Sequence, residues 1–174
     1  MKRIPKIPLL GLWLLLVTLV GVGCNSTIPE EKTPYRQEND TFFKSFAQKS
    51  GYQELLFANE TYPIYYKVLK QAEGNTNTKP LQNSNVQVRY SVKLMSGVVV
   101  EADNGAIKTL SIYDPNGSSI VKGLQIALMH MSVGDKWEVI IPWQLGYRHY
   151  SQGYSIPAYS TLIFEIELVG ISKL

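Results

Sequence analysis

The stretch Val86–Leu94 reads Val-Gln-Val-Arg-Tyr-Ser-Val-Lys-Leu, and its apolar and polar side chains alternate from one end to the other. Successive side chains of a β-strand point to opposite faces of the sheet, so strict alternation is typical of a strand with one face on the core and the other in water. The pattern therefore predicts a half-buried strand. Its core face is expected to carry Val86, Val88, Tyr90, Val92 and Leu94.

The sequence on either side of this stretch predicts further strands and one short helix. Residues 120–131 have apolar side chains at helical spacing, and Asp-Pro-Asn-Gly at 114–117 is typical of a turn. Several antiparallel strands around one short helix indicate an α+β domain. The other strands are expected at residues 62–69, 98–100, 137–141 and 161–169, the last of which again alternates.

The first residues of the chain are expected to be a signal for export. A basic start is followed by the apolar run 9–22, which is short for a membrane-spanning helix, and then by Cys24, the only cysteine. Residues 20–24, Val-Gly-Val-Gly-Cys, resemble the lipobox of bacterial lipoproteins, in which the cysteine is acylated. The sequence thus predicts a lipoprotein signal peptide over 1–23 and lipidation of Cys24. An ordinary signal peptide, with Cys24 removed or idle, is the alternative.

A tether and a short helix are expected between this signal and the folded domain. Residues 25–39 are polar and include two prolines, as in flexible linkers. Asp40 or Thr41 is expected to cap a helix that ends near Gly51, with its phenylalanines docked on the domain. We therefore divide the chain into 1–23 (signal), 24–59 (tether and helical extension) and 60–174 (folded domain).

Charge and residue content exclude several classes of function. Of the 17 basic residues, Lys2, Arg3 and Lys6 belong to the signal, which leaves 14 basic residues to balance the 14 acidic ones. A neutral body has no electrostatic surface for nucleic acid, so no nucleic-acid partner is expected.

Conventional catalytic groups are also scarce. His130 and His149 have no carboxylate or cysteine at a metal-ligand spacing, and no glycine-rich phosphate loop or Gly-x-Ser-x-Gly turn occurs. Glu165 and Glu167 share one face of a strand, but that face is opposite the apolar one, so both are expected to be solvated. The sequence therefore predicts no metal, no cofactor, and neither hydrolase nor redox chemistry.

Six segments occur in the order and with the approximate spacing of a known family. They are 65–69 (Tyr-Tyr-Lys-Val-Leu), 86–90 (Val-Gln-Val-Arg-Tyr), 120–124 (Ile-Val-Lys-Gly-Leu), 131–136 (Met-Ser-Val-Gly-Asp-Lys), 141–147 (Ile-Pro-Trp-Gln-Leu-Gly-Tyr) and 156–164 (Ile-Pro-Ala-Tyr-Ser-Thr-Leu-Ile-Phe). Together they resemble the FKBP family of peptidyl-prolyl cis–trans isomerases, over about residues 60–174.

The resemblance implies a fold and a set of site residues. The fold is an FKBP-like antiparallel β-sheet wrapped around one short α-helix. The site is an apolar pocket that holds a proline ring without covalent catalysis, with Tyr147 as a hydrogen-bond donor to a substrate carbonyl and Glu101 as the second catalytic position. The residues expected to line the pocket are Tyr90, Val100, Ile120, Val121, Leu124, Ile156 and Phe164.

The sequence departs from the pattern of the family in three places. Leu124 stands where the family has a tryptophan on the pocket floor, and Arg148 stands where it has a glycine after the tyrosine. The segment 100–103, Val-Glu-Ala-Asp, replaces Phe-Asp-Ser-Ser, which removes an aromatic wall and lengthens the acid by one methylene. The wall residues of 103–119 cannot be assigned by this comparison.

Three functions remain open on these residues. The first is a peptidyl-prolyl isomerase that acts on proline-containing exported polypeptides from a lipid anchor in the cell envelope, with the outer membrane preferred. The second is a weak or inactive chaperone or binding module on the same fold, which the changes at Leu124 and Val100 favour. The third is a structural lipoprotein, since a fold does not dictate an activity.

Overall fold

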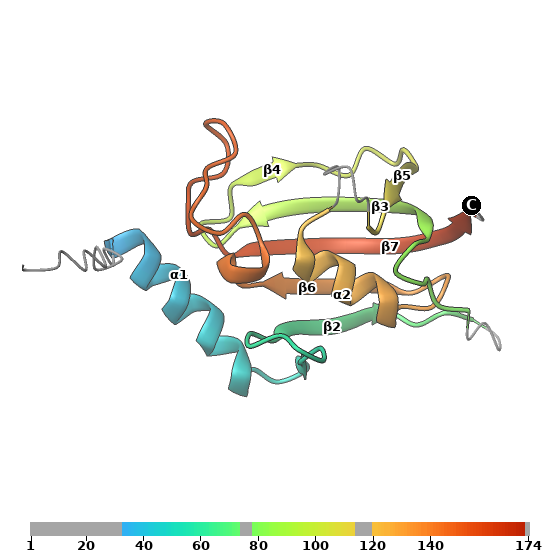
Figure 1. Ribbon diagram of the computed structural model, residues 1–174, viewed down its shortest axis with the longest axis horizontal. Helices are drawn as coiled ribbons and strands as arrows, with labels where there is room; N and C mark the ends of the chain where they lie inside the picture. The colour runs from blue at the N-terminus through green and yellow to red at the C-terminus, as the bar shows by residue number, and fades with distance from the viewer. Residues whose placement is uncertain (1–32, 74–77, 114–119, 173–174) are drawn as a thin grey trace, which may run out of the picture. The chain divides into compact units, whose positions relative to one another are not determined.

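The computed structural model describes residues 33–73, 78–113 and 120–172 of the 174-residue chain (Figure 1). The signal peptide, Cys24 and the predicted turn at 114–117 lie outside these residues. The elements are α1 (Pro34–Lys44), the 3-10 turn η1 (Ser45–Gln48), β1 (Gln53–Leu55), β2 (Ile64–Lys70), β3 (Asn85–Leu94), β4 (Val99–Glu101), β5 (Lys108–Ser111), α2 (Lys122–His130), β6 (Lys136–Ile141), the 3-10 turn η2 (Trp143–Leu145) and β7 (Leu162–Ser172).

The strands form one antiparallel sheet in the order β1-β2-β6-β7-β3-β4, and β5 also pairs with β3. The last strand in the sequence, β7, lies between β6 and β3. Its pairing with β3 runs from Asn85 opposite Ser172 to Leu94 opposite Leu162. Figure 1 shows α2 lying across one face of this sheet. The predicted α+β fold with an antiparallel sheet and one short central helix is confirmed.

The alternation in β3 produces the two faces that the sequence predicted. Val86, Val88, Val92 and Leu94 are buried in the main core, whereas Gln87 and Lys93 are exposed. The core face meets buried side chains of α2, including Ile126 and Leu128. Burying these apolar side chains is the main driving force for the sheet to close on the helix.

The start of α2 sits very close to the sheet because residue 123 is a glycine. A Cβ atom at Gly123 would lie 2.4 Å from Cγ2 of Ile141 on β6, closer than real Cβ contacts allow. The helix can therefore pack with its backbone against β6. This contact fixes the position of residues 120–124 relative to the sheet.

The helix before the sheet begins earlier than predicted. Residues 33–39 were expected to belong to a tether, but α1 starts at Pro34, with the side chain of Thr33 accepting a hydrogen bond from the backbone of Arg36 at 3.3 Å. Threonine is a preferred residue at the N-cap of a helix. Proline is common in the first turn, because the N–H that it lacks would have no partner within the helix.

The docking predicted for the phenylalanines of this segment is confirmed. Phe46 is buried, and it forms a second cluster with Tyr65, Ile140 and Ile163. Tyr65, Ile140 and Ile163 alternate with Tyr66, Val139 and Phe164, of which Val139 and Phe164 belong to the main core and Tyr66 packs against it. The cluster therefore occupies the face of the sheet opposite α2.

Two short strands were not predicted. β1 pairs with β2 and lies before residue 60, so the sheet begins ahead of the expected domain boundary. β5 pairs with β3 inside the segment that the family pattern left unassigned. Within the residues described, no helix is both long and apolar enough to cross a membrane.

Candidate functional site

A cavity of about 110 Å³ lies between the sheet and the start of α2. The structure brings all nine side chains named from the sequence to its walls. Two lining residues, Val92 and Leu110, were not named. The nine are Tyr90, Val100, Glu101, Ile120, Val121, Leu124, Tyr147, Ile156 and Phe164.

The two missed residues carried different signals. Val92 belongs to the core face of the alternating stretch, so its place two residues from Tyr90 could have been used to assign it to the same wall. Leu110 is on β5, which is only four residues long, and nothing in its sequence separates it from a loop.

The inner surface of the cavity is apolar. Leu124 and Phe164 are both buried, and the rings of Phe164 and Tyr90 are 5.9 Å apart at an angle of 47°. A cavity of about 150 Å³ with similar lining residues can hold benzene in another protein. A space of about 110 Å³ therefore suits one small apolar ring.

Tyr147 supplies a polar group to this apolar surface. It follows η2 and is half-buried, and burial together with the negative charge of Glu101 raises the pKa of its hydroxyl. The hydroxyl is therefore protonated at neutral pH. It makes no hydrogen bond to another residue that the structure describes, which leaves it available as a donor to a ligand.

Glu101 is fully engaged with neighbouring side chains. The Tyr90 hydroxyl donates to Oε2 at 2.9 Å, and Nζ of Lys108 donates to Oε1. The same ammonium group lies 4.5 Å from the centre of the Tyr90 ring. Hydrogen bonding from Lys108 lowers the pKa of Glu101, while burial and the bond to Glu101 raise the pKa of Tyr90. The ionised carboxylate thus holds the Tyr90 ring in the cavity wall.

Helix α1 contacts the two segments that deliver Tyr147 and Ile156. Nε1 of Trp143, in η2, donates to Oδ1 of Asp40 at 2.7 Å. The backbone N–H of Thr161 donates to Oδ1 of Asn39 at 2.7 Å, and both residues are buried. A part of the chain that was expected to be a tether therefore supports the loops around the cavity.

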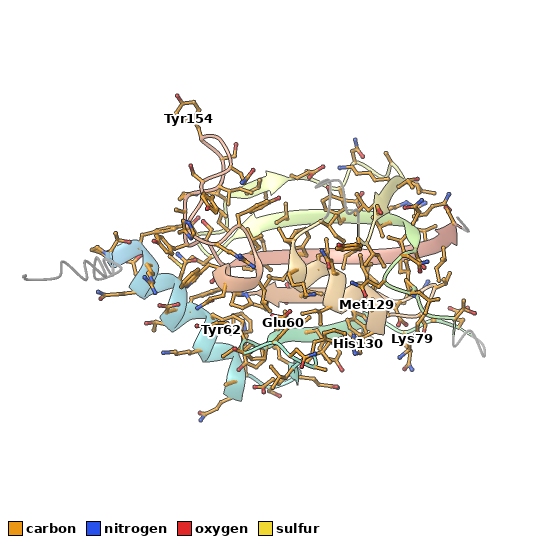
Figure 2. The ribbon with its side chains drawn as sticks, in the orientation of Figure 1. Glu60, Tyr62, Lys79, Met129, His130 and Tyr154 are labelled. Atoms are coloured by element: carbon orange, nitrogen blue, oxygen red, sulfur yellow. The ribbon has the colours of Figure 1, made fainter. Side chains whose placement is uncertain are left out.

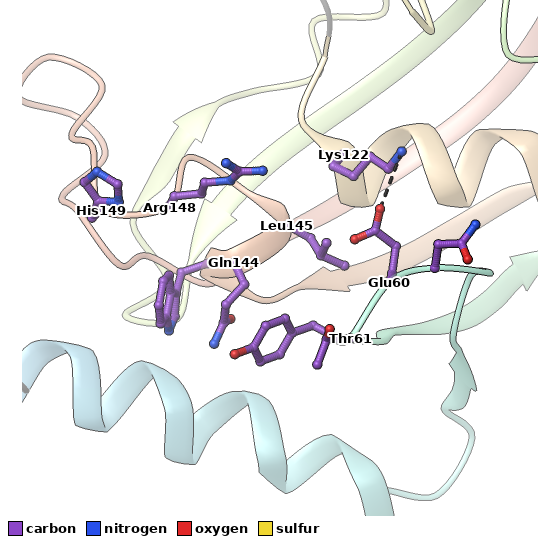
Figure 3. Close-up of a pocket in the computed structure, with 10 residues that line it drawn as sticks. Glu60, Thr61, Lys122, Gln144, Leu145, Arg148 and His149 are labelled. Atoms are coloured by element: carbon purple, nitrogen blue, oxygen red, sulfur yellow. Dashed lines mark ion pairs between the residues drawn. The ribbon is translucent and has the colours of Figure 1, made fainter. Parts of the chain in front are cut away.

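A second and larger cleft, of about 500 Å³, lies beside the cavity (Figure 3). Its walls are residues 59–62, the start of α2 and η2 with the residues that follow it. Lys122 and Glu60 form an ion pair across it at 3.5 Å. The lining residues are Asn59, Glu60, Thr61, Tyr62, Lys122, Trp143, Gln144, Leu145, Arg148 and His149.

Arg148 has an uncommon backbone conformation at the edge of this cleft. Its φ is 59°, in the left-handed region, which costs a residue with a Cβ about 1 kcal/mol or more. The loop is held there by two backbone hydrogen bonds, from the Arg148 N–H to the Trp143 carbonyl and from the Tyr159 N–H to the Arg148 carbonyl, both 2.9 Å.

The described residues contain no group of three or more histidine, cysteine, aspartate or glutamate side chains placed to hold a metal ion. His130 accepts or donates a bond at 2.7 Å with the Ile126 carbonyl of its own helix. Glu165 and Glu167 pair with Lys136 and Arg89 on the sheet face away from the cavity. The polar chemistry of the cavity is thus confined to Tyr147, Tyr90 and Glu101 with its lysine partner.

Comparison with known proteins gives one family and a consistent set of relatives. Residues 76–169 match the FKBP-type peptidyl-prolyl cis-trans isomerase family. Over 108 residues the chain is 36% identical to the FKBP-type 22 kDa peptidyl-prolyl cis-trans isomerase of Escherichia coli, which covers 62% of this chain and 50% of that protein. Over 138 residues it is 30% identical to the outer membrane protein MIP of Legionella longbeachae, covering 75% and 57%.

The chain spans about half the length of these two curated relatives. Among solved structures, a peptidyl-prolyl cis-trans isomerase from Pseudomonas syringae pv. tomato superposes with a TM-score of 0.68 at 27% identity, covering 82% of this chain and 97% of that one. The fold of the described residues is therefore shared along nearly the whole of that structure.

Proposed function

The chain belongs to the FKBP-type peptidyl-prolyl cis-trans isomerase family, and we propose that it catalyses rotation about Xaa-Pro bonds in polypeptides. The observation that carries the proposal is the cavity, because the nine residues expected from the family pattern all line it. Its size suits the five-membered ring of proline, and Tyr147 stands at its wall.

The reaction requires no nucleophile and no cofactor. The C–N bond of a peptide has partial double-bond character, so rotation about an Xaa-Pro bond has a barrier of about 20 kcal/mol and takes tens of seconds or more without a catalyst. A catalyst lowers this barrier by binding the twisted amide more tightly than either planar form. An apolar pocket that excludes water disfavours the planar amide, whose resonance places negative charge on oxygen.

Each polar group then has a role in binding. The proline ring enters between Phe164, Leu124 and Tyr90, and the Tyr147 hydroxyl donates a hydrogen bond to a carbonyl of the substrate. Glu101 is a positioning residue, because its two oxygens accept from the Tyr90 hydroxyl and from Lys108 and so hold the Tyr90 ring in the cavity wall. Burial, and secondarily the charge of Glu101, raise the pKa of Tyr147.

The substrates we propose are exported polypeptides, met by a lipid-anchored enzyme at the cell envelope. The support is the sequence of residues 1–24, with a signal pattern that ends in Cys24, and the similarity to a relative named as an outer membrane protein. The anchored cysteine and the choice of the outer membrane are parts of this proposal.

The test is cis–trans exchange of a short Xaa-Pro-Phe peptide by catalytic amounts of the purified protein. Tyr147→Phe removes one hydrogen bond, so kcat/KM is expected to fall about threefold to tenfold. Phe164→Ala opens the pocket and is expected to lower kcat/KM further. Tyr154→Phe is the matched control, since Tyr154 is fully exposed at the tip of a loop that projects from the body (Figure 2).

The same purified proteins distinguish an active isomerase from a binding module that has no catalytic activity. Leu124 in place of an aromatic floor is the observation that favours it. Binding of an unfolded client with exchange no faster than the uncatalysed rate would establish the module and exclude the enzyme. Equal loss of activity in Tyr147→Phe and Tyr154→Phe would show that the cavity is not the site.

A further inference from the structure

The cleft lined by Lys122, Leu145 and Arg148 neighbours the proposed catalytic cavity along two segments of the chain. The segment 120–122 contributes Ile120 and Val121 to the cavity and Lys122 to the cleft. The segment after η2 does the same, with Tyr147 in the cavity and Arg148 in the cleft. A polypeptide whose proline occupies the cavity therefore has the cleft next to it for the residues on one side of that proline.

The charges of the cleft are unequal. Glu60 is its only acidic side chain, and Lys122 pairs with it at 3.5 Å. Arg148 adds a guanidinium group that forms no hydrogen bond or ion pair with any residue the structure describes. Figure 3 shows this side chain reaching over the cleft toward Lys122. One positive charge is left for a ligand.

The conformation of Arg148 is an independent observation. Residue 148 has a φ of 59°, which a glycine adopts without strain and an arginine does not. Strained conformations that persist at a ligand site point to a role for the side chain that occupies them. Arg148 therefore combines a strained backbone conformation with an unpaired positive charge.

We propose that this cleft is a specificity subsite for a carboxylate on the client polypeptide, with Arg148 as the residue that binds it. The proposal rests on the proposed function, because the proline in the cavity places the flanking residues in the cleft. An exposed pair between a guanidinium and a carboxylate contributes little, so the preference for an acidic over a basic neighbour is expected to be about twofold to fivefold. It is expected to shrink as salt is added.

The experiment measures binding as well as turnover, so that it does not depend on activity. Amidated peptides with one central Xaa-Pro bond carry either glutamate or lysine at successive positions on each side of the proline. The affinity of the full-length protein for each peptide is measured by fluorescence anisotropy, and kcat/KM by cis–trans exchange. We expect the protein to prefer the glutamate peptide over the lysine peptide at one of these positions. Because the peptides are amidated, their C-termini cannot supply the carboxylate.

Two variants are expected to change the preference in opposite directions. Arg148→Gln removes the unpaired charge, so the ratio of glutamate to lysine peptide falls to about one. Glu60→Gln releases Lys122, so the ratio rises. Lys79→Gln removes one exposed charge from a position on another part of the surface (Figure 2) and is expected to leave the ratio as it is.

The outcomes separate this inference from the proposed function. A glutamate preference in affinity that Arg148→Gln abolishes supports the subsite even if exchange is no faster than the uncatalysed rate. Equal affinities for the glutamate and lysine peptides at every position overturn it even if the protein is an active isomerase. A ratio that falls equally in Arg148→Gln and Lys79→Gln assigns the effect to net charge and also overturns it.

Discussion

The carboxylate of Glu101 lies between two donors, the hydroxyl of Tyr90 and the ammonium of Lys108. All three side chains are in or beside the cavity wall, and the charge pair is about one-third exposed, so water still reaches it. The lysine both lowers the pKa of Glu101 and lies against the Tyr90 ring. One ion pair therefore fixes the orientation of an aromatic side chain of the site.

Titration of Glu101 tests this arrangement. Its pKa in the folded protein is lowered from the ordinary value of 4.5, chiefly by Lys108. A lowered pKa contributes stability that is complete above the ordinary value and is lost as the pH falls through the folded one. We expect the NMR signal of the Glu101 carboxyl carbon to titrate below pH 4.5, and the Tyr90 ring to lose its fixed environment in the same range.

Lys108→Met is the matched variant, because it keeps the length of the side chain and removes its charge. The titration of Glu101 is then expected to move upward, since the largest cause of its lowered pKa is gone. A wild-type carboxyl that titrates at or above its ordinary value would contradict the engagement of Glu101 by Lys108.

Among the secondary-structure elements, α1 was not expected to contact the site, yet it supports two segments beside the cavity. Asn39 is completely buried, accepts from the Thr161 N–H and donates from Nδ2 to the Tyr35 carbonyl at 2.9 Å. The Tyr35 hydroxyl bonds Ser160 at 2.9 Å. The guanidinium of Arg36 lies over the rings of Trp143 and Tyr159, at 4.7 and 5.0 Å. The helix thus ties η2 to the start of β7.

Asn39→Ala is expected to lower the free energy of unfolding by about 2 kcal/mol, because it leaves the Thr161 N–H buried without a partner. A urea titration measures this as a lower midpoint at an unchanged slope. Glu38→Ala, at the exposed neighbouring position, is the control and is expected to change the free energy of unfolding by less than about 0.5 kcal/mol. Similar changes in the free energy of unfolding for both variants would show that α1 does not stabilise the loops around the cavity.

The elements that could be predicted from the sequence are those whose two faces differ. Along most of β3, and in β7 after Phe164, one face is buried and the other is more exposed, so the alternation of Val86–Leu94 and of residues 164–168 predicts the strands and their core face. At the start of β7 both faces are buried, because Ile163 packs in the second cluster. β5 has four residues and no fully buried face, so it leaves no such pattern. The start of α1 has a local signal in Thr33-Pro34, but the polar, proline-containing residues around it are equally typical of a linker.

The site was predictable to a different degree. Its residues were named through the family resemblance, because apolar cavity walls cannot be told from core by residue type alone. The contacts that support the cavity from α1 join residues more than 100 positions apart, Asp40 with Trp143 and Asn39 with Thr161. No local pattern in the sequence predicts such pairs.

At the scale of the whole molecule, the proposed anchor would determine where the protein is located. Cys24→Ser removes the only thiol that can be acylated, so the protein is expected to move from the membrane fraction to the soluble fraction of lysed cells. Asn25→Ser is the control, since it changes the next residue and keeps the cysteine. Unchanged membrane fractionation of Cys24→Ser would exclude acylation as the means of attachment.

The central place of β7 affects how the chain reaches its native state. Until residues 162–172 are available, β3 and β6 have no partner between them, and each exposes a row of unpaired backbone groups. Such edges readily join those of other chains, and sheets closed by distant segments form slowly. The chain is therefore most exposed to aggregation before residues 162–172 have been synthesised and paired.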